Sequence, residues 1–192
     1  MIAILKYNAG NIRSVQNALN RLGYSSIITD EKEELLKADK VIFPGVGEAS
    51  SAMNYLKERG LDQLITSLKQ PVLGICLGLQ LMCRYTEEGD TECLNIFDSD
   101  VMLFPQVDKV PHMGWNNFFS MKGDLFKGVT VNDDVYYVHS YYPNISSCTI
   151  ATCDYILPFS AAMNKDNFYA TQFHPEKSAV IGERILKNFL EL

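Results

Sequence analysis

One cysteine of the chain stands in a setting that could make it a nucleophile. Cys76 lies between two glycines in Gly74-Ile75-Cys76-Leu77-Gly78, at the end of the apolar run 71–75. The serine form of this pattern is a sharp strand-to-helix turn that raises a nucleophile above a sheet, and glycines there let helix and strand approach closely. At a helix start, the helix dipole favours the reactive thiolate. The alternative is a cysteine buried as a small apolar residue.

A cysteine nucleophile needs a base, and the chain has three histidines, His112, His139 and His174. Glu176 follows His174 by two residues in the sequence Phe-His-Pro-Glu-Lys-Ser. In an extended segment, residues two apart point to the same side, so Glu176 could orient the imidazole as the third member of a triad does. The alternative is a surface loop with an ordinary histidine and glutamate.

Together, the two motifs resemble the class I, or triad, glutamine amidotransferases. Gly-Ile-Cys-Leu-Gly-Leu-Gln near the middle precedes Phe-His-Pro-Glu-Lys-Ser by about a hundred residues, and the resemblance covers essentially the whole chain. It implies a flavodoxin-like α/β fold. It also implies that Cys76 attacks the carboxamide of L-glutamine, that His174 is the acid and base, and that Glu176 orients His174. This chemistry needs no metal and no organic cofactor.

The composition is that of a globular chain of 192 residues, which predicts a single domain, 1–192. Apolar residues make up 47% and the formal net charge is −6 without a basic stripe, which argues against nucleic acid as a ligand. No apolar run is long enough to span a membrane, and the first residues do not form a signal peptide. Five cysteines without a Cys-x-x-Cys pair indicate reduced thiols and a cytoplasmic location.

The order of the elements predicts a parallel sheet flanked by helices. Strands are expected at 2–6, 25–29, 40–43 and 71–75, and helices at 12–22, 31–39, 48–59 and 61–68, the first capped by Asn11. A surface loop is expected at 85–100. Added antiparallel strands are then expected at 101–104, 118–119, 135–138, 149–152, 159–162 and 168–173, before a closing helix at 179–192. The fold class is therefore α/β with a mostly parallel central sheet.

The segment Pro44-Gly45-Val46-Gly47 follows the third strand, at the edge where parallel sheets bind ligands. The resemblance implies that this loop supplies one N–H of an oxyanion hole, assigned to Gly45, and that Leu77 supplies the other. Because glycine tolerates positive φ, the loop could also flip and point a carbonyl there. An ordinary glycine turn is the alternative.

Substrate contacts are expected from both halves of the chain. Gln80 lies one helical turn beyond Cys76 and could hydrogen-bond the substrate, unless it is a solvated helix residue. The family resemblance adds Gly47 from the glycine loop.

Three further stretches narrow the resemblance: Tyr7–Asn11, Val110–Asn116 and Tyr137–Tyr142. They resemble the glutaminase subunits of imidazole glycerol phosphate synthases, from histidine biosynthesis. This implies a (β/α)₈-barrel cyclase subunit as the partner in a heterodimer, with ammonia passing through the barrel. The implied glutamine contacts are His139, Ser140 and Tyr141, and the implied interface residues are Asn8, Asn11, Met113, Trp115 and Lys177. The 110–116 stretch is expected to be a loop. Ala9 departs from the family pattern, in which a glycine is more typical.

Other functions stay open at this point. A paralogue of the same fold could feed ammonia to another synthase, for instance in surface-sugar biosynthesis. A cysteine peptidase on a related elbow fold is disfavoured by Gln80 and by the His-Pro-Glu order. A catalytically inactive binding module is disfavoured because all three triad residue types are present.

Overall fold

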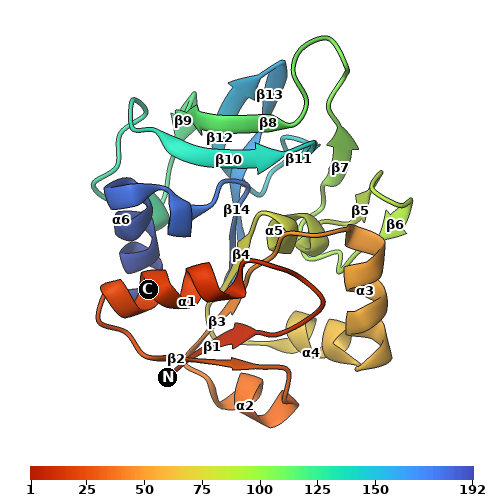
Figure 1. Cartoon of the computed structure of the whole chain (residues 1–192), viewed down its shortest axis with the longest axis vertical. Helices are drawn as coiled ribbons and strands as arrows, with labels where there is room; N and C mark the ends of the chain where they lie inside the picture. Colours follow the sequence, from red (N-terminus) through yellow and green to blue (C-terminus); the bar gives the residue numbers. More distant parts are fainter.

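In the computed structural model, which describes residues 1–192, one eight-stranded sheet runs through the molecule in the order β2-β1-β3-β4-β14-β13-β12-β9 (Figure 1). The strands of the first half are β1 (Ile2–Leu5), β2 (Ser26–Thr29), β3 (Lys40–Phe43) and β4 (Val72–Ile75). They pair in parallel, and so does β14 (Phe168–Thr171) with β4. The strands β13 (Leu157–Lys165), β12 (Thr149–Tyr155) and β9 (Ser120–Met121) add an antiparallel extension. The predicted fold class is confirmed.

Helices cover both faces of this sheet (Figure 1). The helices α1 (Ile12–Arg21) and α6 (Ala179–Leu190) lie on one side. On the other side lie α3 (Ala49–Glu58), α4 (Leu61–Ser67) and α5 (Leu77–Met82), and α2 (Lys32–Lys37) packs near β1. Successive strand residues therefore alternate between two cores: Ala3 and Leu5 join the core under α3–α5, and Ile2 and Ile4 the core under α1 and α6. Because both of its faces are buried, a central strand such as β1 or β4 has no polar side chain, as the sequence predicts.

The second half of the chain differs from the prediction in three places. The stretch 85–100 is not simply a loop, because β5 (Tyr85–Thr86) and β6 (Thr91–Glu92) join β7 (Asp100–Leu103) and β11 (Tyr141–Pro143) in a small sheet. The stretch 110–116 is not a loop either: β8 (His112–Asn116) pairs antiparallel with β10 (Val135–His139). The strand expected at 118–119 forms two residues later, as β9, and its edge position explains its shortness.

Three neighbouring parallel strands end at the same edge of the sheet. The glycine loop follows β3, the cysteine turn follows β4, and His174 comes three residues after β14. The sheet order β3-β4-β14 therefore brings residues 45, 76 and 174 together, although they are far apart in the sequence. The carboxyl ends of parallel strands are where open α/β sheets bind ligands.

Candidate active site

Cys76 forms the turn between β4 and α5 with a left-handed backbone, φ 52° and ψ −104°. Such a conformation is costly for a residue with a side chain and is typical of functional turns. The neighbouring glycines make it possible: a Cβ on Gly78 would lie 1.9 Å from the carbonyl oxygen of Phe43, and one on Gly74 would press against Gly78 and Leu79. The predicted close approach of helix and strand is thus observed.

His174 and Glu176 form a buried pair next to Cys76. Nδ1 of His174 lies 2.7 Å from Oε1 of Glu176, and both side chains are inaccessible to solvent. The expected extended geometry is wrong, because Pro175–Lys177 form a 3₁₀ turn, η2, that returns the carboxylate toward the ring. Since the carboxylate can only accept, Nδ1 carries a proton, and Nε2 is the nitrogen that can exchange a proton with Cys76. Nε2 is buried without a hydrogen-bond partner.

The pKa of His174 is raised to about 10. Burial is the largest influence and lowers the pKa, but the negative charges of Cys76 and Glu176 outweigh it. The backbone of His174 is also fixed, because its N–H donates to the carbonyl of Tyr136 (2.9 Å) and its carbonyl accepts from the Ser178 hydroxyl (2.6 Å). The raised pKa therefore favours the protonated imidazole ring of His174 beside the sulfur.

Asn11 contacts this pair, which the sequence did not predict. It precedes α1 with φ 71°, but its side chain makes no capping bond to the helix. Instead, Nδ2 donates to Oε1 of Glu176. The expected helix cap is wrong: Asn11 has a left-handed backbone instead of the extended one typical of a capping residue, and its side chain bonds to Glu176.

The glycine loop adopts the orientation that closes the predicted oxyanion hole. The N–H of Leu77, one of the two donors assigned to the hole, donates to the carbonyl of Gly45 at 3.3 Å and is therefore occupied. On the other side of the loop, the carbonyl of Pro44 accepts from the hydroxyl of Tyr7 (2.5 Å). That hydroxyl would lie 2.0 Å from a Cβ on Gly45, which explains the glycine.

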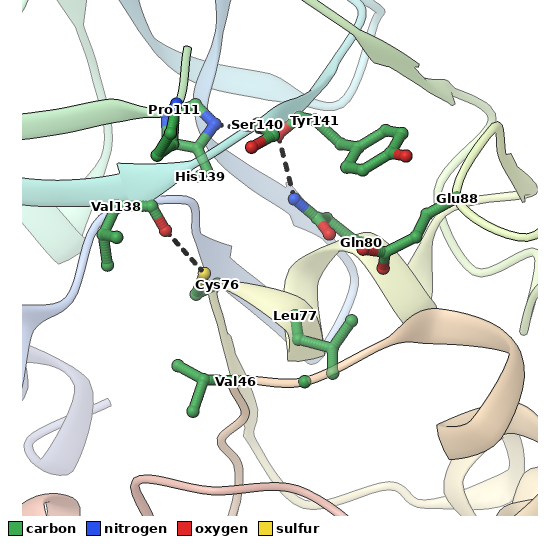
Figure 2. Close-up of a pocket in the computed structure, with 11 residues that line it drawn as sticks. Val46, Cys76, Leu77, Gln80, Glu88, Pro111, Val138, His139, Ser140 and Tyr141 are labelled. Atoms are coloured by element: carbon green, nitrogen blue, oxygen red, sulfur yellow. Dashed lines mark hydrogen bonds between the residues drawn. The ribbon is translucent and has the colours of Figure 1, made fainter.

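A cavity of about 250 Å³ opens beside Cys76 (Figure 2). Its lining includes the other predicted substrate residues, which the fold brings together from three segments; they are Gly47, Gln80, His139, Ser140 and Tyr141. Gly45 is not among the lining residues. Nε2 of Gln80 donates to the carbonyl of Tyr141 at 3.0 Å, as Figure 2 shows, so the amide of Gln80 has a fixed direction.

Two lining or adjoining residues escaped the sequence analysis. Glu88 shares the cavity wall with Gln80, and burial raises the pKa of its carboxyl. It comes from the stretch 85–100, for which the sequence predicts a surface loop, so no sequence signal marks it. Gln172 is fully buried, and its Nε2 donates to the sulfur of Cys76 at 3.6 Å. A glutamine inside the apolar run 168–173, two residues before His174, was a signal that could have identified it.

The predicted interface residues do not share one environment. Asn8, Met113, Trp115 and Lys177 are exposed, and Met113 and Trp115 show over half of their surface, which is unusual for large apolar side chains. Asn11 is instead half-buried against Glu176.

No group of three or more His, Cys, Asp or Glu side chains in the chain is arranged to hold a metal ion. No helix has the length and apolar character needed to cross a membrane.

Curated proteins of similar sequence have names that are consistent with the chemistry of this site. The chain is 63% identical over 194 residues to "Imidazole glycerol phosphate synthase subunit HisH" of Bacteroides fragilis, covering 100% of this chain and 99% of that protein. The proteins of the same name from Salmonella typhimurium and Escherichia coli K12 are 45% and 44% identical, with the same coverage.

Solved structures show the same fold at low sequence identity. A glutamine amidotransferase matches with a TM-score of 0.74 at 20% identity, covering 99% of this chain and 97% of that one. A glutamine amidotransferase from Thermotoga maritima matches with a TM-score of 0.64 at 17% identity, covering 99% and 80%. The family model for "Glutamine amidotransferase class-I" matches residues 4–192. The chain belongs to the class-I glutamine amidotransferase family.

Proposed function

We propose that this chain is the glutaminase subunit of imidazole glycerol phosphate synthase, in histidine biosynthesis. The observation that carries the proposal is the 63% identity over the full length to a protein of that name. The chain hydrolyses L-glutamine to glutamate and ammonia and delivers the ammonia to a (β/α)₈-barrel cyclase subunit. That subunit makes imidazole glycerol phosphate and an aminoimidazole carboxamide ribonucleotide.

The chemistry uses Cys76, His174 and Glu176 in the roles that the sequence predicts. His174 takes the thiol proton at Nε2, and the sulfur of Cys76 attacks the carboxamide carbon of glutamine. The tetrahedral intermediate collapses as His174 returns the proton to the leaving nitrogen, which departs as ammonia and leaves a γ-glutamyl thioester. Water, activated by the same imidazole, then hydrolyses the thioester and releases glutamate. Glu176 keeps the proton on Nδ1 throughout, supported by the 2.7 Å contact.

The cavity offers groups for the two ends of glutamine. We assign Glu88 to the α-ammonium, because it is a half-buried carboxylate on the cavity wall. Gln80, Ser140, Tyr141 and Gly47 line the same cavity and are assigned to the rest of the substrate.

The glycine loop makes the free subunit a poor glutaminase in this proposal. With the carbonyl of Gly45 on the N–H of Leu77, the oxyanion of the intermediate lacks one of its two assigned donors. A missing donor of this kind reduces the rate by about two to three orders of magnitude. Binding of the partner and its nucleotide flips the loop, so glutamine is not hydrolysed without an acceptor for the ammonia.

The exposed residues Asn8, Met113, Trp115 and Lys177 are assigned to the partner interface. Residues 1–192 act as one domain, because a single eight-stranded sheet lies between the two cores and contributes residues to both. We place the enzyme in the cytoplasm, since all five cysteines are free thiols.

The test is glutamine turnover by the free chain, by its complex with the barrel cyclase, and by the complex with the cyclase's nucleotide. We expect a large rise from the first to the third. Equal turnover in all three would contradict the gating, and no glutamine turnover with any partner would contradict the function. Stimulation by the synthase of another pathway, but not by the histidine cyclase, would identify a paralogue.

A further inference from the structure

A line of hydrogen bonds runs from strand β8 to the wall of the glutamine cavity. Nδ2 of Asn116 lies 3.3 Å from Nε2 of His112, and Nδ1 of His112 lies 3.1 Å from Nε2 of His139. Nδ1 of His139 lies 2.8 Å from the carbonyl oxygen of Tyr141. The last of these residues lines the cavity (Figure 2), whereas Asn116 lies at the far end of β8.

The proton positions can be determined from the cavity end. A carbonyl oxygen only accepts, so Nδ1 of His139 carries a proton. In the neutral ring, Nε2 of His139 is then an acceptor, and Nδ1 of His112 must donate to it. Nε2 of His112 is left as an acceptor.

The hydrogen bonds of Asn116, at the other end of the line, independently require the same proton position on His112. The backbone N–H of Asn117 donates to Oδ1 of Asn116 (2.9 Å), and Nδ2 of Asn116 also donates to the carbonyl of Asp154 (3.2 Å). The amide of Asn116 therefore presents N–H to His112, which requires an acceptor at Nε2 of His112. Both ends of the line therefore require the same proton positions, and every group in it has one hydrogen-bond direction.

The surroundings hold both rings neutral and in place. Burial lowers the pKa of His112 to about 4 and, as the largest of several influences, that of His139 to about 3. The ring of His112 stacks on Tyr155 and Tyr137 with centroid distances of 4.0 and 4.8 Å. A second proton on His139 would set two N–H groups against each other at 3.1 Å.

The line ends where two predicted substrate residues meet. The carbonyl of Tyr141 accepts from His139 and from Nε2 of Gln80, which also donates to Oε1 of Gln172 at 3.1 Å. Both bonds of Gln80 use Nε2, so its Oε1 remains for a ligand. His139, by contrast, has both nitrogens engaged by the protein and none for the substrate.

We propose that His112 is a positioning residue for glutamine binding: acting through His139, it fixes the direction of the Tyr141 carbonyl and so of the Gln80 amide. The assignment rests on the proposed function. It gives strand β8 two uses, because its outward residues Met113 and Trp115 are exposed while His112 faces inward.

The test compares two substitutions in the complex with the barrel cyclase and its nucleotide. His112→Phe keeps an aromatic ring against Tyr155 but removes the donor to His139. His112→Asn keeps an N–H near the position of Nδ1. We expect His112→Phe to raise KM for glutamine about tenfold, with kcat changed less than about threefold, and His112→Asn to restore most of the affinity. Asn117→Ala, an exposed neighbour, is the control and should match wild type.

An unchanged KM in folded His112→Phe would overturn the assignment, as would equal losses in the two variants. If His112→Phe does not fold, ¹⁵N NMR of the wild-type imidazoles decides: protons on Nδ1 of both His112 and His139 support the assignment, and a proton on Nε2 of either overturns it. A wild-type chain that does not hydrolyse glutamine in any complex would overturn the proposed function as well.

Discussion

The molecule contains two buried pairs with a histidine, His174 with Glu176 and His112 with His139, in different electrostatic environments. His174 sits between a thiol and a carboxylate, and its pKa is raised to about 10. His112 and His139 contact each other, and burial lowers their pKa values to about 4 and about 3. An asparagine amide also donates a hydrogen bond to one member of each pair: Asn11 donates to Glu176, and Asn116 donates to His112.

Burial alone therefore does not decide the charge of a histidine in this protein. Both pairs are almost completely inaccessible. The difference arises because a negative partner offsets the cost of burying a cation, whereas a second imidazole offers only a lone pair. We therefore expect the first pair to move protons and the second to remain neutral and hold groups in place.

Removing the thiol should have the largest effect. Cys76→Ala should reduce glutamine hydrolysis by about 10⁴-fold or more, because no other group can form the thioester. It should also lower the pKa of His174, measured by NMR, because the negative charge of Cys76 is the strongest influence that raises it. Cys93→Ala, at a half-buried position that does not line the cavity, serves as the control. Substantial turnover by Cys76→Ala would contradict the mechanism, although the partner could still use added ammonium salts.

The two members of the charged pair, His174 and Glu176, can be substituted separately. His174→Ala should impair glutamine turnover nearly as much as Cys76→Ala, whereas Glu176→Gln should retain about tenfold to a hundredfold more activity. The reason is that the orienting member of a triad positions the base without taking part in proton transfer. Steady-state rates at neutral pH measure this difference. A Glu176→Gln protein as active as wild type would remove Glu176 from the triad.

The neutral pair should make the fold sensitive to acid. Its histidines have folded-state pKa values below the unfolded value of 6.5, so their contribution to stability is present above pH 6.5 and is lost as the pH falls toward 4 and 3. Between pH 7 and pH 5, each should cost about 2 kcal/mol of unfolding free energy. His112→Asn removes one of these groups, so urea titrations should show a shallower fall. Parallel pH profiles for the two proteins would show that His112 does not titrate as described. His174 has the opposite sign, because its raised pKa stabilises below pH 6.5 and is lost as the pH rises through about 10.

Substitution of the two asparagines should have the smallest effects. One substitution should change kcat and the other KM, which distinguishes the roles of the two pairs. Asn11→Ala removes a donor to Glu176 and should lower kcat by up to about tenfold, since hydrogen bonds to charged groups contribute about 1.5 kcal/mol or more. Asn116→Ala should instead raise KM, because it acts on the cavity wall through His112. Asn20→Ala, an exposed residue of α1, is the control. The same kinetic change in both variants would mean that the two pairs do not have separate roles.

Local patterns were sufficient for the first half of the fold. The strand predicted at 40–43 is observed with those bounds, and the predicted strand-to-helix turn at Cys76 is observed with its glycines in close contact. These features depend on residues near one another in the chain, such as an apolar run followed by a glycine. The second half was harder, because β8 is a strand only through its pairing with β10, and its sequence has an exposed tryptophan where a buried residue is typical.

The sequence by itself determined the residue types that could carry the chemistry: a cysteine between glycines, and a histidine two residues before a glutamate. Only the tertiary structure decided which groups surround them. The sheet order β3-β4-β14 set the loop, the thiol and the imidazole at one edge, and it buried Gln172 beneath the sulfur. Contacts such as Asn11 with Glu176 and His112 with His139 join positions 165 and 27 residues apart. Local periodicity cannot encode such contacts, because they depend on how strands and helices pack, and packing also decides which histidine is charged.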